Sequence, residues 1–347
     1  MNLDAIFISE TFCRQNDTFS ITNYKVIQFN RQKISRNSIR GSGGCAIALS
    51  DKLLSNHVIV DTIKGRQDGI LAVKLRCTDN DALVGLLANY LPPDSYHYGK
   101  DPESYYLDNS LVYTELEDCD LLIAGGDLNS RTQDDLDYLP CVDADVSSRS
   151  NPDNEKNKHG EYFLQFLKDN RALICNGRVT PDLNDFTFVS PRGRSVPDYI
   201  YCPADHIQYC VSMQVLRVSD AINMFCLPVP FSLPDHSILV SEFDLYSCLP
   251  RSSHVNAPSA LKKLPPKKNI RKINENFMSS VETIQLVNQT IDKLELFVKN
   301  QTDMNNLYVE VKSLFLSEMD KLPNLPSTNV KSHKKLSENL LPSGTKN

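Results

Sequence analysis

Short apolar runs that end in polar residues dominate the first 245 residues, and this pattern constrains the fold more than any other feature. The runs are rich in Val, Ile, Leu, Phe or Tyr and are closed by Gly, Pro, Asn or Asp, which is typical of β-strands. Two segments between them, 101–117 and 160–171, have apolar residues at helical spacing. Many strands with few helices and no regular alternation predict an α/β (α+β) fold of packed sheets flanked by helices. The predicted strands are 4–10, 43–50, 69–77, 82–93, 120–127, 172–178, 185–190, 196–203 and 236–245.

Length and composition narrow the class of protein. The chain has 347 residues, of which 41% are hydrophobic and 23% charged, as in globular proteins with one large domain and an appendage. No run approaches the ~20 apolar residues of a membrane helix. The N-terminus carries an acidic residue and no basic flank, unlike a secretory signal. The ten cysteines form no CxxC pair, which favours reduced thiols in an intracellular protein over a zinc site.

The composition changes after the last predicted strand. We expect one domain over 1–246, a Pro-, Ser- and Lys-rich linker over 247–268, a helical connector over 269–322 and a disordered tail over 323–347. The stretch KKLPPKKNIRK (262–272) holds six basic residues in eleven. It is either a nuclear-localisation or nucleic-acid-contacting patch, or a solvated linker. The first 250 residues hold 22 basic and 34 acidic residues, a balance compatible with a cation site.

The stretch LLIAGGDLNSR (121–131) joins a buried strand to polar side chains. Asp127 and Asn129 lie two residues apart, so in extended backbone both side chains point the same way. A carboxylate and an amide would then emerge together at the end of the strand, where α/β sheets often place their chemistry. The alternative is a simple Asx-type turn after the strand.

Similar polar residues end four other predicted strands. Glu10 follows AIFIS, Tyr90 ends LLANY, Asp198 lies in SVPDYIYC, and Asp235 with His236 precedes SILVSEF. Taken alone, each of these residues is explained by a structural role. Together they would form an oxygen-rich rim with a histidine, suited to a hard divalent cation and a phosphate.

The order of these motifs resembles the endonuclease/exonuclease/phosphatase (DNase-I-like) superfamily. The spacing and residues of the motifs are most similar to those of the endonuclease domain of LINE-type non-LTR retrotransposons. The resemblance implies a four-layer αββα sandwich of two mixed β-sheets, with a C-terminal helical tail appended here. It spans roughly residues 4–245 and rests on FISET, RGSGGCAIALS, NYLPPDS, GGDLNSR, DFTFVSPRGRSVPDYIYC and LPDHSIL.

The resemblance also implies roles for the residues at the strand ends. Asp127 would accept a proton from the attacking water, and Asn129 would orient that water or a phosphate oxygen. His236, oriented by Asp198, and Tyr90 would hydrogen-bond the phosphate. The remaining implied roles are metal binding by Glu10 and Asp235, with Mg²⁺ or Mn²⁺, and nucleic-acid contact by Thr187, Arg192 and Arg194.

The motifs depart from the family pattern in three places. A first strand carrying an Asn is missing before the strand that ends at Glu10, which predicts a weaker metal site and unpaired sheet edges. Pro93 stands where several abasic-site nucleases have a phosphate-binding Asn, and Pro234 stands where Ser is usual.

Three functions therefore stay open at this point. The first is a Mg²⁺-dependent DNA endonuclease of a retrotransposon-like element, with a reverse transcriptase as a partner encoded downstream and no membrane association. The second is a phosphatase or phosphodiesterase of the same superfamily. The third is a truncated remnant that acts at most as a binding protein.

Overall fold

The computed structural model describes residues 3–32, 34, 41–140, 146–245, 280–281, 283–289, 311, 313 and 317. Contacts between residues divide the chain into two units, Met1–Ser253 and His254–Asn347. In the second unit, residues 283–289 are helical. The predicted linker, the basic cluster at 262–272, the tail and most of the helical connector lie outside the described residues.

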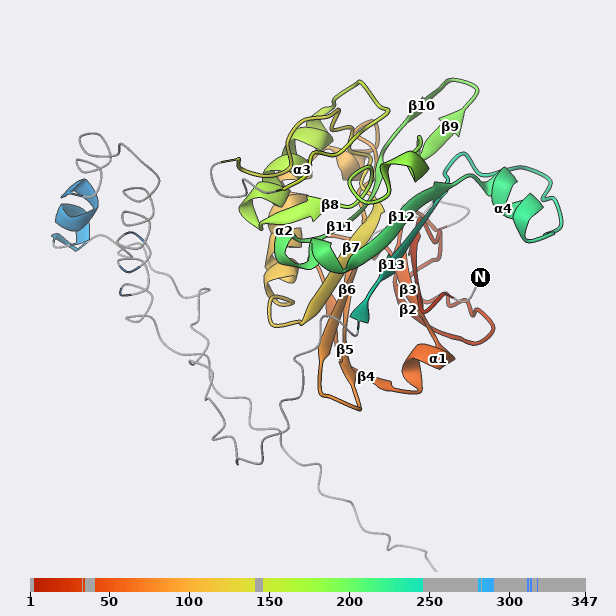
Figure 1. Cartoon of the computed structure of the whole chain (residues 1–347), viewed down its shortest axis with the longest axis horizontal. Coiled ribbons are helices and arrows are strands. Elements are labelled where there is room, and N and C mark those ends of the chain that lie inside the picture. Colours follow the sequence, from red (N-terminus) through yellow and green to blue (C-terminus); the bar gives the residue numbers. More distant parts are fainter. Residues whose placement is uncertain are drawn as a thin grey trace, which may run out of the picture. The chain divides into compact units, whose positions relative to one another are not determined.

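A six-stranded sheet forms the centre of the first unit (Figure 1). Its strands pair in the order β4–β5–β6–β7–β11–β8, with β6 and β7 parallel and all other neighbours antiparallel. The inner strands are almost continuously apolar because both faces of the sheet are covered. The strands are β4 (His57–Lys64), β5 (Ile70–Cys77), β6 (Leu83–Tyr90), β7 (Leu121–Asp127), β11 (Asp198–Pro203) and β8 (Ala172–Ile174).

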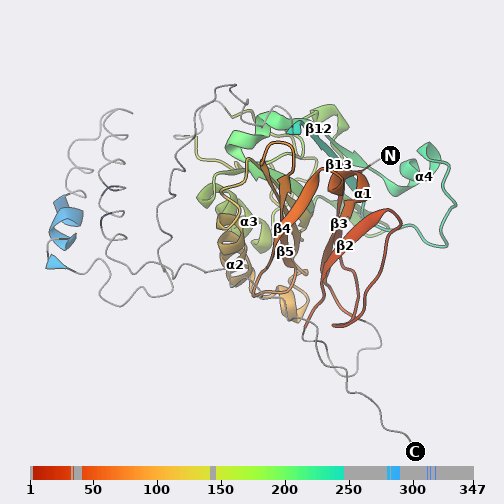
Figure 2. The ribbon, with the colours of Figure 1, turned by 90° about the horizontal axis from the view of Figure 1, so that it is seen from below.

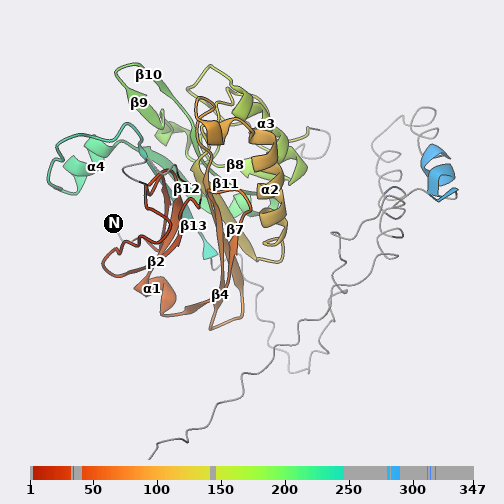
Figure 3. The same ribbon diagram turned by 180° about the vertical axis from the view of Figure 1, so that it is seen from behind.

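Helices α2 (Pro102–Thr114) and α3 (Lys158–Asp169) cover one face of this sheet (Figures 1 and 3). Side chains at both N-termini accept backbone N–H groups, Asp101 from Ser104 and Asn157 from Gly160. Aromatic rings from α2, α3 and β11 fill the space between helices and sheet. They include Tyr106, Phe163, Phe166, Tyr199 and Tyr201.

A second β-layer packs on the other face of the central sheet. It contains a three-stranded sheet in the order β1 (Ala5–Ser9), β3 (Cys45–Ser50), β2 (Tyr24–Phe29). Ile47 and Leu49 of β3 meet Val73 and Leu86 of the central sheet in a shared core. The antiparallel pair β12 (Cys210–Leu216) and β13 (Ile238–Phe243) belongs to another core with Cys202 of β11.

Short elements complete the first unit. Figure 2 shows α4 (Val218–Met224) on the side of the second layer and α2 and α3 on the opposite side. The hairpin of β9 (Phe188–Ser190) and β10 (Gly193–Ser195) projects beyond the sheets in Figure 1. The predicted class, two packed β-sheets with flanking helices, is confirmed. The remaining short helices are α1 (Asp51–Leu54) and the 3₁₀ turns His97–Gly99, Pro181–Leu183 and Ala204–Tyr209.

Four observed strands, β2, β4, β10 and β12, were not predicted as strands. Each lies at the edge of its sheet, and polar residues break its apolar run. In the described sheets, β1 also pairs on one side only, with β3. No helix in the described part of the chain combines the length and apolarity needed to cross a bilayer.

Candidate active site

Three of the predicted residues occupy one row across the central sheet. Tyr90 on β6 is the register partner of Asp127 on β7, which is in turn the partner of Asp198 on β11. Residues opposite each other on neighbouring strands bring their side chains within contact distance. The pairing of three strands distant in sequence therefore places a phenol and two carboxylates side by side where these strands begin or end.

The glycine before Asp127 lets β7 approach β6 closely. Gly126 has a φ of 146°, and a Cβ there would overlap the carbonyl oxygen of Asn89 on β6. The Asp127 N–H donates to Oγ of Ser9 (3.2 Å), whose hydroxyl donates to the Asn89 carbonyl (3.2 Å). Ser9, which the sequence did not single out, thus ties β1 to the strand end that carries Asp127.

Asn129 orients the Asp127 carboxylate. Its backbone N–H donates to Oδ1 of Asp127 (2.9 Å), and its side-chain Nδ2 donates to Oδ2 of Asp127 (3.1 Å) and to the Leu91 carbonyl (2.9 Å). Asn129 has a φ of 47°, a left-handed conformation that Asn tolerates better than most residues. The amide nitrogen is fully engaged, so Oδ1 of Asn129 is the atom that can accept from a water or a substrate hydroxyl.

Asp198 and His236 form a second pair next to Asp127. Nδ1 of His236 lies 3.0 Å from both carboxylate oxygens of Asp198. Oγ1 of Thr187 donates to Oδ2 of Asp198 (2.7 Å), and the Phe188 ring packs edge-on against the His236 ring (5.0 Å between centroids). The imidazole is held on one side by a carboxylate and on a face by an aromatic ring, which leaves Nε2 for a substrate.

The charges of this cluster act on one another. Burial lowers the pKa of His236, but the hydrogen bond with Asp198 and the charges of Asp198, Asp127 and Glu10 raise it to about 9. The pKa of Asp127 is raised well above its ordinary value by burial and by the charge of Asp198. Glu10 raises the pKa of Asp127 further, whereas His236 lowers it. The carboxylate at 127 therefore lies in a crowded, strongly negative environment.

Glu10 reaches the cluster from β1. The Tyr90 hydroxyl donates to Oε1 of Glu10, and burial together with this carboxylate raises the pKa of the phenol well above its ordinary value. Glu10 has a φ of 54°, an uncommon conformation for a glutamate, as the chain leaves β1. Tyr90 therefore stays protonated at neutral pH and acts as a hydrogen-bond donor.

The other four predicted residues lie around the cluster or beneath it. Asp235 is exposed, and its carbonyl oxygen accepts the Val189 N–H (2.8 Å). Arg192 and Arg194 are exposed on the β9–β10 hairpin, with the Arg194 guanidinium over the Phe186 ring (4.4 Å). Thr187 is fully buried beneath Asp198, so the structure gives it a positioning role.

The cluster offers the donors that a hard cation requires. Asp127, Asp198 and His236 place one ligand atom each within 4.8 Å of one another, the one such group among the described residues. Asp198 is engaged by His236 and Thr187, and Asp127 by Asn129, so Glu10 is the carboxylate that remains for an ion, with Asp127 beside it. Carboxylate oxygens suit Mg²⁺ or Mn²⁺, and a cation would offset the burial and the neighbouring negative charge that raise the pKa of Asp127. The residues present therefore fit a divalent metal.

Comparisons with known proteins find similar solved structures only. No protein-family model matches the sequence, and no curated protein matches it. Among solved structures, a 3'-5' exonuclease (NExo) from Neisseria meningitidis is 15% identical over 70% of this chain and 89% of its own, with a TM-score of 0.47. An AP endonuclease from Archaeoglobus fulgidus is 16% identical over 70% and 89%, with a TM-score of 0.47.

A retrotransposon protein is also among these structures. The endonuclease domain of TRAS1, a telomere-specific non-LTR retrotransposon, is 21% identical over 65% of this chain and 82% of its own, with a TM-score of 0.43. These likenesses concern the fold. The function must come from the side chains of the cluster.

Proposed function

We propose that this protein hydrolyses phosphodiester bonds in DNA with the help of a divalent cation, as an endonuclease of the retrotransposon type. The observation that supports this best is the row Tyr90–Asp127–Asp198 with Glu10 and His236 beside it. A base, a hydrogen-bond donor and carboxylates for a cation lie together at one sheet edge. Hydrolysis of a phosphate ester needs these three elements.

The residues divide the work in this proposal. Asp127 accepts the proton of the attacking water, and Asn129 keeps the carboxylate and the water in place. His236, held at Nδ1 by Asp198, donates from Nε2 to a non-bridging phosphate oxygen, where negative charge grows in the transition state. Tyr90 donates its hydroxyl to the phosphate when the substrate displaces it from Glu10.

Glu10 would hold the cation, with Asp235 at the exposed rim. When bound, a divalent ion polarises the phosphate and neutralises developing charge. A plasmid-nicking assay tests the proposal. Supercoiled DNA should convert to open circles with Mg²⁺ and remain intact in EDTA. Full cleavage in EDTA would contradict the metal requirement. The absence of cleavage under every condition would contradict the proposal that the protein hydrolyses DNA.

Metal binding should be visible as thermal stabilisation. Since a ligand at ~100 times its Kd adds about 2.7 kcal/mol to stability, saturating Mg²⁺ should raise the Tm by roughly 5–10 °C. Glu10→Gln should lose most of this shift, because a principal ligand loses its charge. Glu117→Gln, the same change at an exposed position shortly before β7 begins and thus far from Asp127 at its end, should retain the shift. Equal shifts in the two variants would show that Glu10 does not hold the ion.

The hairpin arginines should contribute to DNA binding through phosphates. Arg192→Ala should weaken binding of all sequences and reduce the slope of log K against log salt by about 1, since one phosphate contact is lost. Arg76→Ala is the matched control, because Arg76 is exposed at the opposite end of β5 from the site. Fluorescence anisotropy over a salt series measures both. An unchanged slope for Arg192→Ala would exclude the contact.

The proposal includes two features outside the described residues. The basic cluster at 262–272 would direct the protein to the nucleus, and a reverse transcriptase encoded downstream would use the nick. A reporter protein carrying 262–272 tests the first. If it stays in the cytoplasm, the cluster does not direct nuclear localisation.

A further inference from the structure

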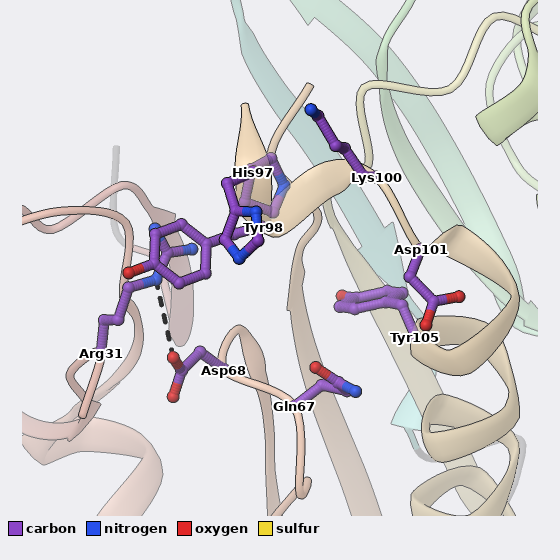
Figure 4. A pocket seen from close by; sticks show the side chains of 9 residues that line it. Arg31, Gln67, Asp68, His97, Tyr98, Lys100, Asp101 and Tyr105 are labelled. Atoms are coloured by element: carbon purple, nitrogen blue, oxygen red, sulfur yellow. Dashed lines mark ion pairs between the residues drawn. The ribbon is translucent and has the colours of Figure 1, made fainter. Parts of the chain in front are cut away.

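A pocket of about 350 Å³ lies beside the candidate active site. In Figure 4, Arg31, Asp68 and Tyr98 stand on one side of it, and Asp101 and Tyr105 stand on the other. The side chains come from three segments distant in sequence: the loop after β2, the β4–β5 turn, and the loop that leads into α2 together with the first turn of that helix. None of these residues has a role in the proposed hydrolysis.

One short segment separates the pocket from the catalytic cluster. Pro92 lines the pocket, and the preceding residue, Leu91, accepts a hydrogen bond from Asn129 (2.9 Å). The Tyr90 N–H donates to the carbonyl of Gly69 (2.8 Å), next to Asp68 in the β4–β5 turn. The segment from Tyr90 to Pro92 thus faces the hydrolytic site with one end and the pocket with the other. A ligand in the pocket would be the immediate neighbour of a phosphate held by Tyr90.

The pocket wall is built around a buried guanidinium. The Arg31 side chain is 3% exposed, donates from Nη1 to Oγ of Ser42 (2.9 Å) and lies over the Tyr98 ring (4.1 Å). Nε of Arg31 is buried and forms no hydrogen bond, although the Asp68 carboxylate lies 3.6 Å away. A buried donor without a hydrogen bond is uncommon and costs free energy until a ligand or water accepts from it.

The charges of the wall favour a neutral ligand. Arg31 and Lys100 are balanced by Asp68 and Asp101, so a second phosphate would meet two carboxylates. A planar group with both donors and acceptors on its edge would find partners of both kinds. The Arg31 guanidinium covers one face of the Tyr98 ring, so the other face of this half-exposed ring is the flat surface on which an unpaired base can stack.

We propose that this pocket takes an unpaired nucleobase of the DNA strand, one nucleotide away from the phosphate that is cut. The inference rests on the proposed function and specifies its substrate. A base inside a duplex is stacked and cannot enter a concave site, so the base must be flipped out or lie in an overhang or loop. The enzyme should therefore prefer DNA with an unpaired nucleotide next to the cleavage position.

A double-mutant cycle between protein and DNA tests the pocket. Oligonucleotides with the cleaved position in a single-stranded loop are prepared with one base at a time replaced by an abasic linker. Binding to the full chain is measured by fluorescence anisotropy with Ca²⁺. Removing one base beside the cleaved phosphate should weaken binding to the wild type by about 5- to 100-fold.

Tyr98→Ala should weaken binding of the intact oligonucleotide similarly and should no longer respond to removal of that base. Tyr98 is 44% exposed, so the variant should fold, and Arg31→Met provides a second test from the buried side of the pocket. Tyr96→Ala is the matched control, a tyrosine 62% exposed in the same loop and not part of the pocket wall.

The outcomes separate this inference from the proposed function. If every base removal has the same effect on the wild type and on Tyr98→Ala, the pocket holds no base, even if the protein cuts DNA. If the wild type neither binds nor cuts any DNA with Mg²⁺, both proposals are wrong. The inference is supported if removal of one base weakens binding to the wild type and to Tyr96→Ala but not to Tyr98→Ala.

Discussion

Asp127→Asn should lower the initial rate of plasmid nicking by about 10²- to 10⁴-fold, the range that general-base catalysis contributes. The substitution keeps the shape of the side chain and its hydrogen-bonding position beside Asn129, but the amide cannot accept the proton of the attacking water. His236→Ala should have an effect of similar size, because the phosphate then loses its hydrogen-bond donor. Rates are measured with Mg²⁺ at several protein concentrations.

The control for this change is Asp118→Asn. Asp118 carries the same side chain near the opposite end of β7 and is 55% exposed, in a surface pair with Lys74 (2.6 Å). Its loss should leave the nicking rate within about twofold, since surface ion pairs contribute little to stability. Thermal unfolding confirms that each variant is folded. If folded Asp127→Asn retained more than a tenth of the wild-type rate, another residue would be the base.

The largest expected effect on stability is at Arg178. Arg178→Met should destabilise the first unit by about 3–5 kcal/mol, because it leaves the Asp137 carboxylate buried without its partner. The pair is almost fully enclosed, with side chains 3% and 1% exposed, and is bidentate at 2.7 and 3.0 Å. It joins the long segment after β7 to β8, since Oδ2 of Asp137 also accepts the Ile174 N–H (2.8 Å). Urea unfolding measures the loss.

Two further variants test the cause. Arg217→Met removes a pair of similar geometry with Asp185 (2.7 Å), but its side chains are 46% and 37% exposed, so the cost should be no more than about 1 kcal/mol. Arg178→Met combined with Asp137→Leu should recover part of the stability, because no buried charge is left alone. Equal costs at Arg178 and Arg217 would show that burial is not what makes the first pair important.

The predicted strands and the observed ones differ for a physical reason. Strands such as β6 and β7 are covered on both faces, so the side chains on both faces are mostly apolar. The resulting continuous apolar run is visible in the sequence. β4 at the sheet edge has only one strand neighbour, β5, and of its eight residues only His57 is buried. Polar side chains interrupt such runs, and only pairing with a neighbour identifies them as strands.

The sequence by itself determined which residues stand at the ends of the buried strands, because the apolar runs that mark these strands are visible in the sequence. That was sufficient to predict Glu10, Tyr90, Asp127, Asp198 and His236 as members of one cluster, and their order made the resemblance recognisable. Their proximity needed the strand pairing of β6, β7 and β11, which joins residues more than thirty positions apart.

Only the tertiary structure decided what surrounds these residues. Thr187 was predicted from its hairpin to contact nucleic acid, but its burial beneath Asp198 depends on how the segment before β9 packs on β11. Arg31 has no neighbour in sequence that indicates a function, and its place beside Tyr98 and Asp68 comes from three loops that meet at one edge of the sheets. Periodicity reports which face of an element is buried, whereas a pocket depends on which elements meet, and that is set by the packing of the whole domain.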